Sequence, residues 1–243
     1  MDPETDTRSA ALTFVVASIT TVVSVVALFD SSVMDLFVRN LPLLESGEWW
    51  RAVTPVLVQP DGWGQFAFNL LGTVLVGVAV QRRVGPGTWL SAYAIGGVGS
   101  VAIYSVWHPA DTGGGSSAAV AALIGVLVVT CAIAPDRSRL GGCAQVYATF
   151  FAVYLTALDV GGVAASVIAG NASIVATVVA RRAMGVERTS FVVLSVVTLA
   201  GITMTVLRDD HGSGILIGLV FGILAAIRRR PSTTARSPQD RIT

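Results

Sequence analysis

Two residues far apart in the sequence, Ser117 and His211, have the side chains needed for nucleophilic catalysis. A serine hydroxyl is a weak nucleophile until a neighbouring base accepts its proton, and histidine commonly serves as that base. Acyl transfer also requires hydrogen-bond donors for the negative charge that develops on the carbonyl oxygen. The side-chain amides of Gln65 and Asn69, with the main-chain amides at the start of the helix expected near Ser117, are suitable donors.

These residues begin runs of small or polar residues with helical spacing. The runs are Gln65, Asn69, Thr73 and Gly77; Ser117, Ala121 and Gly125; and His211, Gly214, Gly218 and Gly222. Small residues let helix backbones approach closely, so packing of the second run on the third would bring Ser117 and His211 together. Asp209 and Asp210 directly precede His211, and neighbours in sequence do not face one another on a helix. The spacing therefore predicts a two-residue dyad without an acid.

The composition indicates which elements must position these residues. Of the 243 residues, 53% are hydrophobic and 13% are charged, and the mean hydropathy is +0.72, which is too apolar for a soluble globule. The net charge of +1 gives no sign of nucleic-acid binding. Cys131 and Cys143 lack the spacing of a metal site or a disulfide framework and are expected to be small apolar side chains. We expect an all-α polytopic membrane protein.

About eight transmembrane helices follow from the apolar segments. A bilayer core about 30 Å thick needs roughly 20 apolar residues per helix. The stretch from 143 to 180 is too long for one crossing, and we divide it near Asp159, Gly161 and Gly162. The predicted spans are 10–29, 64–81, 88–107, 116–134, 144–158, 160–180, 189–207 and 212–228.

The arginines indicate the orientation of these helices. With eight crossings, one face receives Arg82 and Arg83, Arg137 and Arg139, Arg181, Arg182 and Arg188, and Arg228 to Arg230. Since cytoplasmic loops are enriched in positive charge, that face and both termini are expected in the cytoplasm of a multi-pass cell-membrane protein.

Two boundaries divide the predicted chain into three parts. Residues 1–9 form a cytoplasmic N-terminus, residues 10–228 a transmembrane domain, and residues 229–243 a disordered cytoplasmic tail. The long external connection 30–63 contains LPLLESGEWWRAVTP. We expect it to be a structured loop in the membrane interface, where tryptophan is favoured.

Several motifs jointly resemble the rhomboid family of intramembrane serine proteases. The family's Trp-Arg pair corresponds to Trp50 and Arg51, and GGSSAAVAALIG resembles its Gly-x-Ser-Gly motif with Gly115 and Ser117. QFAFNLLGTVLVGVAVQRRVG resembles its His-x-x-x-Asn helix, with Asn69 matching. HGSGILIG fits His-x-x-Gly-x-x-x-Gly through His211, Gly214 and Gly218. The resemblance implies a rhomboid-like helical bundle, here a six-helix core plus two extra helices.

The sequence departs from the family pattern near these motifs. Gln65 stands where the family usually has the oxyanion-hole histidine, and Ala118 replaces the glycine after the nucleophile. Gln81 replaces the usual acid at the end of the same helix, and Gln59 stands where an upstream histidine is common. Ala121 occupies the position of an aromatic that often packs on the catalytic histidine, so the base is expected to be less firmly held.

Two other residues compete with His211 for the role of base. The family has one helix between its serine and histidine helices, whereas this sequence predicts three. An alternative alignment of DVGGVAAS places Asp159 where the base belongs, but the complete glycine spacing after His211 favours His211. The second competitor is His108, which is expected in a loop.

The resemblance implies an intramembrane protease that cleaves transmembrane segments of other membrane proteins near the external face. Ser117 would be the nucleophile and His211 the base, with Gln65, Asn69 and Gly115 at the oxyanion site. No metal or cofactor is expected, and the partners are transmembrane substrates and the lipid bilayer. One alternative is a catalytically inactive relative that binds membrane clients. A small transporter is the other, although paired broken helices and inverted repeats are not evident.

Overall fold

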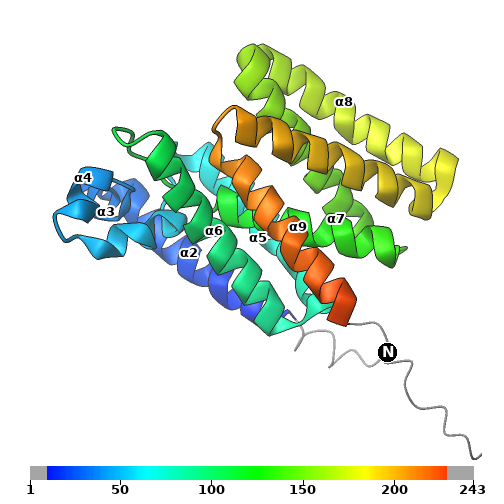
Figure 1. The fold of residues 1–243 in the computed structure, drawn as a ribbon, viewed down its shortest axis with the longest axis horizontal. Helices are drawn as coiled ribbons and strands as arrows, with labels where there is room; N and C mark the ends of the chain where they lie inside the picture. The colour runs from blue at the N-terminus through cyan, green and yellow to red at the C-terminus, as the bar shows by residue number, and fades with distance from the viewer. Residues whose placement is uncertain (1–9, 229–243) are drawn as a thin grey trace, which may run out of the picture.

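Helices make up the regular structure of residues 10–228, the part of the chain that this computed structural model describes. The predicted cytoplasmic N-terminus 1–9 and tail 229–243 lie outside the described residues. Two short 3-10 helices, η1 and η2, lie between α4 and α5. The elements are α2 Ala11–Phe29, α3 Ser31–Phe37, α4 Leu41–Glu45, η1 Trp49–Ala52, η2 Thr54–Leu57, α5 Trp63–Val84, α6 Pro86–Trp107, α7 Ser117–Ile133, α8 Arg139–Val206 and α9 Asp210–Arg228 (Figure 1).

The 68-residue element α8 is three helical segments joined by two sharp turns. Gly162 has φ 71° and Gly185 has φ 80°, a region of backbone space that glycine adopts without a steric penalty. The chain therefore reverses twice, and the later part of α8 runs back beside the earlier part (Figure 1). The first turn lies where the sequence indicated one, beside Asp159 and Gly161. Counting the three segments separately, the described residues contain eight helices of roughly membrane-crossing length, which agrees with the prediction.

Hydropathy supports a membrane location for these helices. In the described residues, α2, α5, α6, α8 and α9 are long and apolar enough to cross a bilayer, and α7 is apolar but has only 17 residues. Every residue of α7 from Ala118 to Ala132 is buried. A helix that is apolar on all sides is stable only where it is surrounded, so α7 is the central helix of the bundle.

Glycines allow α9 to lie directly on α7. A Cβ at Gly214 would lie 2.6 Å from the carbonyl oxygen of Ala118, and one at Gly222 would lie 2.8 Å from Cβ of Val129. Gly218 meets Ala122 even more closely. The predicted packing of the glycine run in α9 against the small-residue run in α7 is therefore present. Because no side chain separates the two helices, the start of α9 is held beside the start of α7.

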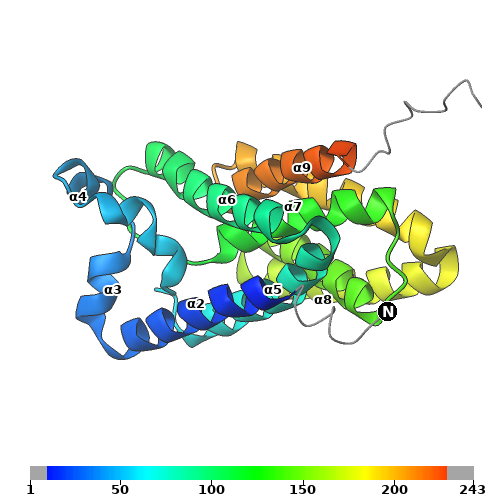
Figure 2. The same ribbon diagram turned by 90° about the horizontal axis from the view of Figure 1, so that it is seen from below.

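The connection 30–63 is structured, as the sequence predicted, and Arg51 fixes its shape. The guanidinium of Arg51 is 5% exposed and donates to the carboxylate of Glu48 at 2.6 Å and to the carbonyl oxygens of Asp35 and Val38. The indole of Trp50 donates to the carbonyl oxygen of Leu36. Figure 2 shows α3 and α4 at one end of the bundle.

Candidate active site

Ser117 is the first residue of α7 and follows a glycine-rich turn that brings its hydroxyl to the surface of a cavity. Gly115 has φ 139° and donates its main-chain N–H to the carbonyl oxygen of Pro55, which anchors the turn on the connection 30–63. Ser116, in contrast, is 1% exposed, and its hydroxyl accepts from Nε2 of Gln59 at 3.4 Å. Ser117 is therefore the serine of this pair that a substrate can reach.

His211 lies in the first turn of α9, and the carboxylate of Asp209 fixes its ring. Oδ1 of Asp209 is 2.7 Å from Nδ1 of His211 and also accepts from the main-chain N–H of His211 at 2.8 Å. Oδ1 of Asp210 lies 3.2 Å from the same Nδ1. The prediction that no acid accompanies the histidine is wrong, because Asp209 precedes the helix and acts as its cap, where the rule for neighbours within a helix does not apply.

Asp209 is suited to hold a basic imidazole. Its side chain is 20% exposed, as is typical of a group at the edge of a cavity. Burial by itself would raise the pKa of Asp209, but the positive charge of His211 in its protonated form and the hydrogen bonds from its ring and main chain hold that pKa below its usual value. Asp209 is therefore a carboxylate at neutral pH. Since Nδ1 of His211 is occupied, Nε2 is the nitrogen available to Ser117.

Ser117 and His211 border the same cavity, which has a volume of about 230 Å³. Its wall comes from the connection 30–63, the start of α5, the last part of α6, the turn before α7 and the start of α9. In the described residues no direct hydrogen bond joins the two side chains, although both line this cavity. Catalytic hydrogen bonds are often longer before substrate binds. The arrangement resembles a catalytic set of serine, histidine and carboxylate in which the hydrogen bond between serine and histidine is not formed.

The two predicted oxyanion donors lie beside the serine. A Cβ at Gly115 would lie 2.7 Å from Nε2 of Gln65, 3.3 Å from Oγ of Ser117 and 3.5 Å from Nδ2 of Asn69. A side chain at position 115 would therefore fill the space between these three groups. Nε2 of Gln65 donates to the carbonyl oxygen of Gly114 at 3.0 Å, and Nδ2 of Asn69 donates to Oε1 of Gln59 at 2.7 Å. Each amide carries two hydrogens, so each retains one for another acceptor.

The ring of His211 also has an aromatic neighbour, which the sequence did not reveal. Phe151, in the first segment of α8, meets it edge to face with ring centroids 5.7 Å apart. Phe151 is fully buried and stacks on Phe68 of α5 at 5.5 Å. The expectation from Ala121 that the base is loosely held is therefore wrong, because α8 supplies the aromatic contact in place of α7.

Arg39 and Tyr104 also line the cavity and were not singled out by the sequence motifs. Arg39 is 7% exposed, its guanidinium lies 4.0 Å from the centre of the Tyr104 ring, and its main-chain N–H donates to the carbonyl oxygen of Gly113. A buried cation is thus placed in a cavity whose lining also includes Asp61, Asp209 and Asp210. No local motif marks Arg39, since packing alone brings it to the turn before α7.

The two competing bases do not line this cavity. His108 contacts the carbonyl oxygen of Arg208 at 3.2 Å and lies 3.8 Å from the carboxylate of Asp111. Asp159 is exposed near the end of the first segment of α8. Of the alternatives weighed from the sequence, the geometry therefore favours His211.

One group of residues at the site has the geometry of a metal ligand set. Within the described part of the chain, ligand atoms of Asp209, Asp210 and His211 lie within 4.8 Å of one another. The close contact between Nδ1 of His211 and Asp209 already gives these atoms partners. The absence of a metal from the function stays a prediction.

Comparison with known proteins identifies the family to which this chain belongs. The model of the Rhomboid domain matches residues 46–180, which is more than half of the chain. The chain belongs to the rhomboid family. Ser117, Gln65, Asn69 and the Trp50–Arg51 pair lie inside the matched residues, whereas His211 lies beyond them.

Two relatives from Bacillus subtilis (strain 168) are similar over part of this rhomboid domain. The chain is 39% identical to "Rhomboid protease GluP" over 88 residues, which are 36% of this chain and 17% of the relative. It is 36% identical to "Putative rhomboid protease YdcA" over 83 residues, 33% of this chain and 41% of the relative. The matched part thus spans less than half of either relative.

Proposed function

We propose that this rhomboid protein is an intramembrane serine protease that hydrolyses peptide bonds in transmembrane segments of other membrane proteins. The observation that carries the proposal is the shared cavity that Ser117, His211 and Gln65 line. The names of the two relatives support the same reaction class. The arginine distribution favours a position of this cavity at the external face of the membrane.

The side chains can be assigned roles in acyl transfer. His211 accepts the proton of Ser117 as the hydroxyl attacks the scissile carbonyl, and the resulting oxyanion receives hydrogen bonds from Gln65 and Asn69. His211 then donates the proton to the leaving amine, and a water activated by the same ring hydrolyses the acyl-enzyme. Asp209 holds the ring so that Nε2 faces Ser117 and stabilises the imidazolium that forms during the reaction.

A catalytically inactive relative that binds membrane clients is the second candidate function. It is favoured by the open contact between Ser117 and His211 and by Gln65 at the position of the family's oxyanion histidine. The two functions differ in one property, which is whether a bound transmembrane segment is cut.

Cleavage in a bilayer separates the two candidates. Purified full-length protein in liposomes would be incubated with a membrane protein that has one transmembrane segment, and the product ends would be found by mass spectrometry. The protease should cut inside that segment near its external end, and the Ser117→Ala variant should give no product. Binding of the segment by the wild-type protein without any product would contradict the protease and identify the inactive relative.

The oxyanion donors can be tested by comparing substitutions at one position. Gln65→Ala should lower kcat by about 10²-fold, because removal of one oxyanion donor costs roughly that much in other enzymes. Gln65→Glu has nearly the same shape but no donor, so it should be at least as slow. Asn69→Ala should have a comparable effect. Gln65→His should give a rate equal to or higher than that of the wild-type protein. Unchanged rates in both alanine variants would show that main-chain amides form the oxyanion site.

A further inference from the structure

A second, larger cavity lies at the other side of the bundle, between α5 and the first two segments of α8. It is a groove of about 780 Å³, open to the surroundings of the protein. Along most of its length the lining is apolar and includes Phe68, Leu71, Leu75, Val146, Ile174 and Val178. An apolar lining of this kind requires an apolar occupant, which in a membrane protein is available from the bilayer.

One end of the groove is cationic, because four arginines also line it: Arg137, Arg139, Arg181 and Arg182. Arg137 pairs with Glu187 at 3.4 Å, and the nearby carboxylate of Asp136 pairs with Arg83 at 3.5 Å. The other three guanidiniums have no carboxylate in a salt bridge within the described residues. The groove therefore ends in an excess of positive charge.

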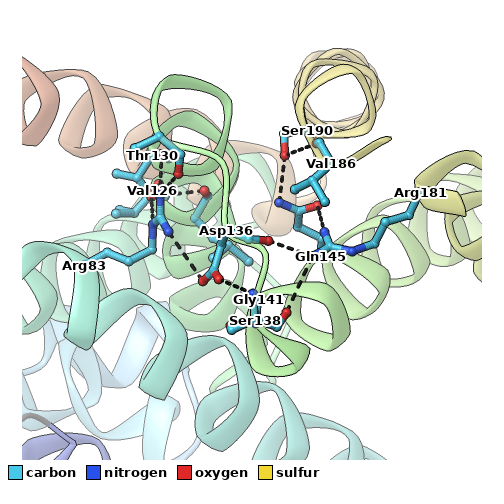
Figure 3. A network of polar contacts seen from close by, with 12 residues as sticks. Arg83, Val126, Thr130, Asp136, Ser138, Gly141, Gln145, Arg181, Val186 and Ser190 are labelled. Carbon is cyan, nitrogen blue, oxygen red and sulfur yellow. Dashed lines mark hydrogen bonds and ion pairs between the residues drawn. The ribbon is translucent and has the colours of Figure 1, made fainter. Parts of the chain in front are cut away.

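Arg181 is held in place by neutral acceptors. Its guanidinium donates to the carbonyl oxygen of Asp136 at 2.6 Å and to Oε1 of Gln145 at 3.3 Å (Figure 3). Gln145 is in turn fixed by its donation to Ser190 at 3.0 Å. These bonds orient the arginine without neutralising its charge. Arg139 and Arg182 are exposed and have no polar partner in the described residues, so they are free to bind an anion.

We propose that this groove binds one anionic phospholipid. The headgroup phosphate lies among Arg139, Arg181 and Arg182, and an acyl chain follows the apolar wall between α5 and α8. Guanidinium groups bind phosphate oxygens through paired hydrogen bonds, and basic pockets between transmembrane helices are typical sites for anionic headgroups on the cytoplasmic side. The arginine distribution predicts the cytoplasm at this end of the bundle.

Polarity decides between a lipid and other occupants. A transmembrane segment would cover the apolar wall but would bring no anionic group to the arginines. A free phosphate ion would satisfy the arginines but leave the apolar wall empty. The groove has arginines at one end and an apolar wall along the rest. A phospholipid matches both parts, because its phosphate can bind the arginines while an acyl chain covers the wall. This site lies apart from Ser117 and His211, so it stands whether or not the protein cleaves substrates.

Lipid retention measured by native mass spectrometry tests this site. The full-length protein would be equilibrated with equal amounts of phosphatidylglycerol and phosphatidylcholine that carry the same acyl chains. The wild-type protein should retain phosphatidylglycerol about tenfold better. The double variant Arg139→Gln, Arg182→Gln should lose that preference, because each arginine near an anionic headgroup raises binding severalfold.

A matched control removes the same charge from the same end of the bundle. Arg188 and Arg228 are exposed there but do not line the groove, so Arg188→Gln with Arg228→Gln should keep the preference. Val178→Trp, which narrows the apolar wall, should lower the retention of both lipids. Equal retention of the two lipids by the wild-type protein, equal losses in the two double variants, or unchanged retention in Val178→Trp would each overturn the proposal.

Discussion

Replacing Gly214 with leucine should abolish cleavage, and this is the largest effect expected outside the catalytic side chains themselves. A Cβ at this position would already lie 2.6 Å from the carbonyl oxygen of Ala118, which is main chain and cannot rotate away. A leucine therefore has to push the start of α9 from the start of α7. Since Ser117 and His211 are on those two helix ends, the shift would separate the nucleophile from the base. The rate should fall by more than about 10³-fold, as a displaced base no longer contributes.

A graded series and a control make this result specific. Gly214→Ala should give an intermediate rate, because its single methyl group meets the same oxygen. Gly87→Leu in α6 adds the same side chain where no heavy atom lies within 4 Å of the new Cβ, and it should leave the rate unchanged. Full activity of Gly214→Leu with a normal unfolding temperature would show that catalysis does not depend on close packing of α7 and α9.

The variant Asp209→Asn should lower kcat by about 10³-fold with little change in KM. Asparagine is an equally good helix cap, so the start of α9 should be preserved. The amide, however, carries no charge to stabilise the imidazolium and can donate to Nδ1, which selects the wrong tautomer of His211. In other serine proteases the matching substitution costs up to about 10⁴-fold in kcat. A purely structural role for Asp209 would instead change the unfolding temperature and leave kcat intact.

Asp210 provides the matched control for this prediction. Its carboxylate lies 3.2 Å from Nδ1 of His211, compared with 2.7 Å for Asp209, and it makes no hydrogen bond to the His211 main chain. Asp210→Asn should therefore lower kcat less than tenfold. The role of Asp209 in holding the His211 ring would be contradicted if Asp210→Asn lowered kcat more than Asp209→Asn, or if neither variant changed kcat.

The helical arrangement could largely be predicted from the sequence, because membrane spans depend on local hydropathy and on the position of turns. The long apolar stretch was divided near Gly162, which has the positive φ that a sharp turn requires. The contact of the α7 and α9 runs followed from the spacing of small residues. In each case the signal is a local pattern, which is the glycine at the turn or the spacing of small residues within each helix.

The rest of the site depends on contacts between distant segments, which no local pattern encodes. Phe151 reaches His211 because the first segment of α8 packs against α5 and α9. Arg39 reaches the cavity through a main-chain bond to Gly113. Asp209 was missed for a different reason, since its sequence position was evident but its place before the helix was not.

Labelling with a fluorophosphonate probe tests the central claim most directly, because the probe reacts with an activated serine and needs no knowledge of the substrate. The full-length protein in detergent would be labelled, digested and analysed by mass spectrometry. The probe should be found on Ser117, should be absent from the Ser117→Ala and His211→Ala variants, and should persist in Ser116→Ala. No labelling of the wild-type protein, or labelling that survives Ser117→Ala, would contradict a serine protease centred on Ser117 and His211.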